Sequence, residues 1–163
     1  MQPGANSALT ALESLPLAVS MRHDLWLYPV VEIAHISGFA ILVGSIVALD
    51  LRLLGLSRAV PIRPLTRHVV PWAFAAILVI VPTGALMFAA HASDFIVNRA
   101  FQLKLLLIVL AGTNAALFHT MVYRHVGRWE NDAATPARVK VHAAASLVLW
   151  FGVIACGRLI AYL

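Results

Sequence analysis

The chain has 163 residues, of which 61% are hydrophobic and only 12% are charged, and its formal net charge is +5. A soluble domain is nearer half apolar and a quarter charged, so this composition excludes an ordinary soluble protein and predicts an integral membrane protein. At about 20 residues per span, the length accommodates four membrane-spanning helices and leaves no room for a separate soluble domain.

Residues 1–24 form an N-terminal segment that is only weakly apolar. We expect it on the periplasmic side, with a short amphipathic helix over about 7–20 lying on the membrane surface. No basic region precedes its apolar part, which is not the pattern of a signal peptide. Met1 and Met21 are both compatible with a translation start.

Residues 25–163 are predicted to form one four-helix membrane domain. Four apolar stretches are long enough to cross a bilayer, over about 25–54, 68–90, 100–123 and 139–162. The basic, proline-containing linker after the first stretch is expected to lie outside the helices. The predicted fold class is therefore all-α, an up-down bundle of four transmembrane helices.

Within the second stretch, Pro82 and Gly84 predict a kink. The hydroxyl group of Thr83 is available to satisfy a carbonyl group that the proline leaves without its usual donor.

Positive charge is distributed unevenly between the two sides of this bundle. The loops at 52–67 and 124–140 hold four lysine or arginine residues each, whereas the opposite loops hold only Arg22 and Arg99. The positive-inside rule then places both basic loops in the cytoplasm and both termini on the periplasmic side of a bacterial inner membrane. The same rule explains the net charge, so we expect no nucleic-acid partner.

Ionisable side chains within the spans cost about 2.5–3.5 kcal/mol each on insertion scales and therefore usually face a bundle interior. From the rise of the helix, they fall at two depths. The outer layer consists of Glu32, His35, His91, Lys104 and Arg158, together with the uncharged polar side chain of Gln102. The inner layer consists of Asp50, Arg52, His68, His119 and His142.

Two layers of histidine in a four-helix bundle are what a b-type haem protein needs, because each low-spin iron takes two neutral imidazoles from facing helices. His68 with His142 is the natural inner pair, because the second and fourth spans are diagonal in an up-down bundle. His119 is the alternative inner ligand. His35 is the best outer ligand, and its nearest candidate partner, His91, lies shallower and on a different face.

Two further interactions are predicted from spacing. Glu32 lies about one turn from His35, where a carboxylate can orient an imidazole or accept its proton. Asp50 and Arg52 are expected to form a structural pair at the end of the first span.

Four segments carry a recognisable pattern: HISGFAILVGSIVALDLRLLGL, PWAFAAILVIVPTGALMF, AFQLKLLLIVLAGTNAALFH and SLVLWFGVIACGRLIAY. Together they resemble a bacterial family of four-helix membrane proteins that is a domain of unknown function. The resemblance covers nearly the whole chain after residue 20 and implies the fold and the membrane, but no activity. More distantly, the histidine-bearing plan is similar to small diheme cytochromes b and to the membrane part of copper-resistance protein D.

The resemblance also implies a set of recurring residues: His35, Asp50, Arg52, Lys104, His119, Trp150 and Arg158. This set favours His35 and His119 as functional histidines over His68 and His142. It conflicts with the depth argument, because His35 and His119 come from opposite halves of the bundle, and both assignments stay open.

The sequence therefore predicts a membrane electron-transfer subunit that binds haem b and exchanges electrons with a quinone or inner donor and a periplasmic redox protein. Lys104 and Arg158 would tune the reduction potential or would instead extend outward to the interface. One alternative is a copper-handling protein, because Met87 and His91 are at helical spacing near the outer face. Another is a structural or assembly subunit of a larger membrane complex or oligomer, without a cofactor.

Several other chemistries are excluded by residues that the chain lacks. Cys156 is the only cysteine, which excludes an intrachain disulfide, a thiolate zinc site and an iron–sulfur cluster. The sequence also contains no nucleophile elbow, phosphate-binding loop or zinc signature. We therefore expect a redox carrier or subunit rather than a stand-alone enzyme.

Overall fold

The computed structural model describes residues 3–129 and 135–162, which form helices and contain no strand. Four long helices are apolar enough to cross a membrane within this part of the chain. They are α3 (Leu27–Leu54), α4 (Ile62–Ala90), α6 (Arg99–Leu117) and α7 (Ala137–Leu159). The all-α class and the four predicted spans are confirmed, and the protein is a multi-pass membrane protein by the length and composition of these helices.

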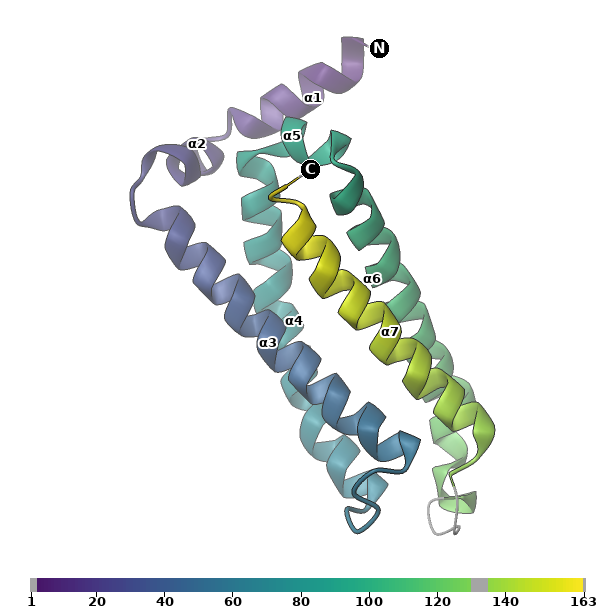
Figure 1. Ribbon diagram of the computed structural model, residues 1–163. Coiled ribbons are helices and arrows are strands. Elements are labelled where there is room, and N and C mark those ends of the chain that lie inside the picture. The colour runs from purple at the N-terminus through teal and green to yellow at the C-terminus, as the bar shows by residue number, and fades with distance from the viewer. Residues whose placement is uncertain (1–2, 130–134, 163) are drawn as a thin grey trace.

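The four helices run up and down and form two close pairs, α3 with α4 and α6 with α7 (Figure 1). Contact between α3 and α7 joins the pairs, and the rings of Phe39 and Trp150 meet there at a centroid distance of 6.1 Å. We call the end that carries α1 and the end of α7 the terminal end, and the opposite end the basic end. Which end faces the periplasm stays a prediction.

Many large apolar side chains of the four helices are exposed on the outside of the bundle. Leu78 on α4 and Val148 on α7 are 77% and 72% exposed. Such exposure is unfavourable in water and costs nothing in a hydrocarbon environment. The exposed apolar surface is therefore the surface that the bilayer covers.

Local sequence explains two of the helix ends. Gly55 follows α3 with a left-handed φ of 108°, and the N–H groups of Gly55 and Leu56 donate to the carbonyls of Arg52 and Leu51. This is the Schellman arrangement, which favours glycine because a Cβ is strained at positive φ. At the start of α6, the side chain of Asn98 accepts a hydrogen bond from the N–H of Phe101 at 3.1 Å.

The second span begins six residues earlier than predicted, at Ile62 rather than at residue 68. The linker was expected to exclude helix because of its prolines. However, Pro61 stands just before the helix and Pro64 lies in its first turn, where no intrahelical N–H is required. The prolines of this linker therefore start the helix instead of preventing it.

The helix α4 continues through Pro71 and Pro82. Pro82 cannot donate to the carbonyl of Leu78, its partner one turn earlier. The hydroxyl of Thr83 donates instead to the carbonyl of Val79, at 2.6 Å. The predicted role of Thr83 is therefore wrong, because neither acceptor of its hydroxyl, Val79 nor Ile80, is the carbonyl that Pro82 leaves without a donor.

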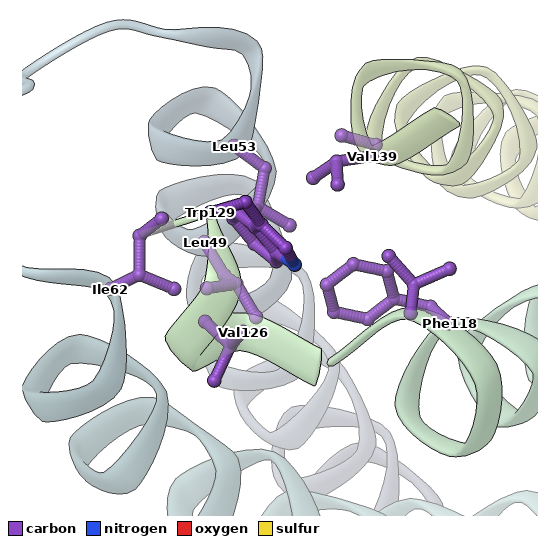
Figure 2. Packing of buried hydrophobic residues seen from close by; sticks show 9 residues of the cluster. Leu49, Leu53, Ile62, Phe118, Val126, Trp129 and Val139 are labelled. Atoms are coloured by element: carbon purple, nitrogen blue, oxygen red, sulfur yellow. The ribbon is translucent and has the colours of Figure 1, made fainter. Parts of the chain in front are cut away.

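The third span extends beyond the end of α6. It passes through one π-helical turn, η1 (Phe118–Val122), into a 3₁₀ segment, η2 (Tyr123–Arg128). Together with Leu49, Leu53 and Val139, residues of these turns form the apolar cluster that closes the basic end of the bundle (Figure 2). A π-helical turn shifts the faces of the helix that follows it, and such turns are frequent at functional positions.

The N-terminal segment forms two helices rather than the single one predicted over 7–20. They are α1 (Pro3–Glu13) and α2 (Pro16–His23). The break falls before Pro16, because proline cannot continue a helix but is well suited to begin one. The side chain of Met21 on α2 is 1% exposed and packs with Val31 of α3 and Ala90 of α4.

Polar contacts also hold this segment to the terminal end. Arg22 donates to the carbonyls of Ala90 and Glu13, at 2.9 and 2.7 Å. Glu13 accepts from both the backbone N–H and the hydroxyl of Ser93, in the first turn of the short helix α5 (Ala92–Val97). The hydrogen bonds from Ser93 lower the pKa of Glu13 below its usual value.

We expect Met21→Ala to weaken the attachment of α2, because truncating a fully buried methionine typically costs about 2–5 kcal/mol. Hydrogen exchange of the amides in 16–23 measures the free energy of local opening. Leu25→Ala is the matched control, because Leu25 is 79% exposed. Equal exchange in Met21→Ala and wild type would contradict the packing described above.

We expect Ser93→Ala to raise the pKa of Glu13 toward its ordinary value of about 4.5, because the Ser93 hydroxyl is its strongest hydrogen-bond donor. The pKa is lowered in the folded state, so the contact stabilises the fold above the ordinary value and is lost as pH falls through the lowered one. Carbon NMR of the Glu13 carboxyl group measures both values. A titration midpoint that does not change between the two proteins would show that the Ser93 hydroxyl contributes nothing.

Candidate functional site

His35 of α3 is held by α4 in one defined orientation. Its Nδ1 lies 3.0 Å from Oγ1 of Thr83. The single hydrogen of the Thr83 hydroxyl has two backbone acceptors within reach, the carbonyls of Val79 and Ile80, at 2.6 and 3.1 Å. Thr83 therefore accepts from His35, so Nδ1 carries the proton and, in the neutral ring, Nε2 carries the free lone pair.

Gly84 makes room for this ring. A Cβ built on Gly84 would lie 3.0 Å from Cε1 and 3.5 Å from Nδ1 of His35. The imidazole thus rests against the backbone of α4, and any larger residue at position 84 would displace it. Pro82, Thr83 and Gly84 together form the part of α4 that receives His35.

Charged groups from two helices act on His35. Lys104 of α6 and Glu32 of α3 both interact with it electrostatically. The ammonium nitrogen of Lys104 lies 3.7 Å from where a Cβ of Gly157 on α7 would be. The half of the bundle nearer the terminal end therefore contains a cluster of polar side chains from α3, α4 and α6. Gly157 of α7 lies beside this cluster.

His142 of α7 shows the same arrangement in the other half of the bundle. Its Nδ1 lies 2.7 Å from Oδ1 of Asn114 on α6, and Nδ2 of Asn114 donates to the backbone carbonyl of His142 at 3.0 Å. The second bond fixes which end of the amide is oxygen, so Nδ1 of His142 carries the proton. Again Nε2 is left free in the neutral ring.

Asn114 was missed by the sequence analysis. Its signal was an amide in the middle of an apolar span, and such a group requires a partner inside the protein. The sequence could not identify His142 as that partner, since the two residues lie on different helices.

Asp50 is buried, with 6% of its surface exposed, and lies on the side of α3 that faces α7. Ser146 of α7 is the polar side chain that interacts with its carboxyl group. Oδ2 of Asp50 has no hydrogen-bond partner among the described residues.

The predicted pair between Asp50 and Arg52 is wrong. Arg52 is also buried, but it donates to the carbonyls of Val60 and Arg58, at 2.5 and 3.3 Å. Residues two apart lie on nearly opposite sides of a helix, which explains why the guanidinium group turns to the loop and the carboxyl group to the bundle.

The remaining predicted histidines lie nearer the surface. His68 is exposed beside Arg63 and Arg67 at the basic end. His119, in the π-helical turn, is exposed and has ring contacts with Phe118 and Tyr123 at 5.3 and 5.5 Å. None of the ring contacts between described residues joins two histidines, and the pairing of His68 with His142 around an iron stays a prediction.

The outermost groups are also placed by local contacts. His91 ends α4, with its ring edge-on to Tyr28 at 6.1 Å and its Nδ1 3.9 Å from Asp94. Arg158 donates to the hydroxyl of Tyr162 at 2.6 Å and is exposed. Neither contacts His35 among the interactions of the described residues.

The copper alternative gains no observation from the structure. Met87 packs against the cluster around Met21. Within the described ranges, no group of three or more histidine, cysteine, aspartate or glutamate side chains is placed to hold a metal ion.

Comparisons with known proteins give one match. No curated protein and no solved structure matches this chain. The expected likenesses to diheme cytochromes b and to copper-resistance protein D therefore stay predictions. A family model described as a family of unknown function matches residues 28–163, and the chain is accordingly a member of that family, DUF6644.

Proposed function

We propose that the protein is a membrane electron-transfer subunit of the bacterial inner membrane that holds haem b between its transmembrane helices. It would pass electrons between a quinone or an inner donor and a periplasmic redox protein. The observation that carries this proposal is the state of His35, whose Nδ1–H is bound to Thr83 and whose Nε2 is free.

This arrangement fits the requirements of a haem ligand. Iron binds a neutral imidazole through one nitrogen, while the other N–H is usually fixed by a polar group that sets the tautomer and the ring orientation. His35 and His142 both meet this description, one in each half of the bundle. We therefore assign them as the first ligands of an outer and an inner haem, and His68 and His119 stay candidates for the inner partner.

Lys104 has a defined role in this proposal. Haem, when bound, supplies one-electron chemistry, and the protein sets the potential at which it occurs. A cation that interacts with His35 favours the reduced state, because reduction adds negative charge nearby. Arg158, at the terminal end, lies farther out and would act more weakly.

A purely structural subunit is the main rival. In a purely structural subunit, the polar side chains inside the bundle would serve to hold the helices together. Each of them should then find its hydrogen-bond partners on neighbouring helices. Instead, Oδ2 of Asp50 lacks a partner, and the hydrogen bonds of His35 and His142 leave Nε2 free. These three atoms without a hydrogen-bond partner favour a protein that binds a further group over a purely structural subunit.

The decisive experiment is a dithionite-reduced minus oxidised spectrum of protein purified from haem-replete cells, with a pyridine haemochrome assay for stoichiometry. We expect a low-spin b-type spectrum that decreases in His35→Ala and in His142→Ala. His125→Ala is the matched control, because that side chain is exposed and bonds only to the carbonyl of Met121 among the described residues. A wild-type spectrum without haem absorbance would refute the proposal.

We expect Thr83→Val to weaken haem binding by about 10–100-fold, the usual effect of removing a group that orients a metal ligand. Valine keeps the shape of threonine but cannot accept from Nδ1 of His35. Titration of the haem-free protein with haemin measures the affinity.

Thr113→Val provides a close control for this substitution. The Thr113 hydroxyl donates to a carbonyl one turn earlier, that of Val109, as Thr83 does, but it holds no histidine. If both variants bind haem equally well, the Thr83 contact has no part in binding.

A further inference from the structure

Asp50 is the polar side chain that the proposed haem sites do not use. It lies within α3, four residues before the helix ends at Leu54, and is more than nine-tenths buried. An ionised carboxylate in such a place costs several kcal/mol unless a cation or several hydrogen-bond donors compensate it. The neutral acid avoids most of that cost.

The groups around Asp50 do not supply a compensating charge. Arg52, on the same helix, donates to the loop carbonyls. On α6 and α7, Asn114 and His142 bind each other, and Ser146 is left as the side chain that interacts with the carboxyl group. No charged side chain in the described part of the chain, on α4 or elsewhere, interacts electrostatically with Asp50.

The unpartnered oxygen shows where a proton would sit. Oδ2 of Asp50 is shielded from solvent and has no donor, so as a carboxylate oxygen it would be a buried acceptor without a partner. Adding a proton there removes the charge and forms one O–H bond. The hydroxyl of Ser146 remains to bind the carboxyl group in both states.

We propose that Asp50 and Ser146 form a proton-binding site inside the membrane bundle, in which Oδ2 of Asp50 takes up and releases the proton. The site lies about 6 Å of helix rise from the end of α3 at the basic end of the bundle. Buried carboxylic acids of this kind serve as proton carriers in membrane proteins. The site shares no residue with the proposed haem ligands.

Infrared spectroscopy of the protein reconstituted in lipid tests the proposal directly. At neutral pH we expect a C=O stretching band of a protonated carboxylic acid, which shifts in D₂O and is absent from Asp50→Asn. Asp94→Asn is the matched control, because Asp94 is an exposed carboxylate on α5 and its loss should leave the band unchanged. Absence of the band from the wild type, or its persistence in Asp50→Asn, would overturn the proposal.

A second variant guards against failure of Asp50→Asn to assemble. Ser146→Ala removes the hydroxyl but keeps the acid, so the band should persist and move to higher frequency as its hydrogen bond is lost. An unmoved band would place the protonated acid elsewhere. The last measurement adds sodium at neutral pH. If sodium converts the protonated acid of Asp50 to the carboxylate, the site binds a metal cation and the proposal is overturned.

None of these readouts involves haem. A protein with the Asp50 band and no haem absorbance would retain this inference and lose the electron-transfer function, and the opposite result would do the reverse.

Discussion

Hydrocarbon offers no hydrogen bonds, so each polar group that the four helices direct inward has to find its partner within the protein. The contacts between helices follow from this constraint. Thr83 of α4 binds His35 of α3, and Asn114 of α6 binds His142 of α7. Ser146 of α7 interacts in the same way with Asp50 of α3. Two clusters of buried apolar residues, one around Met21 and one around Phe118, close the ends of the bundle.

Each of the two histidines is bound through one nitrogen, and this is what separates a candidate site from ordinary helix packing. A threonine whose hydrogen is already donated can only accept, and an amide whose nitrogen is already donating presents only its oxygen. The neighbouring helices thus decide the tautomer of each ring. Because Gly84 has no side chain, the imidazole of His35 can approach α4 closely enough to contact Thr83.

Polar groups occupy both halves of the bundle, and His142 shares the half toward the basic end with Asp50. His35 and Lys104 lie in the half toward the terminal end, where an electron carrier would be reached from that side. Asp50 lies toward the basic end with an oxygen unused. A redox centre and a separate buried acid in one bundle are the two components that coupling of electron and proton movement requires, although each is proposed on its own observation.

The sequence by itself determined the all-α class and the four spans, because hydropathy and span length depend only on local composition. It misplaced the start of α4 and the pair between Asp50 and Arg52, since proline tolerance depends on position in the first turn and side-chain direction depends on helical rotation. Only the tertiary structure decided that Asn114 meets His142 and Thr83 meets His35. Those contacts join residues 28 and 48 apart, and no local pattern specifies which faces of separate helices come together.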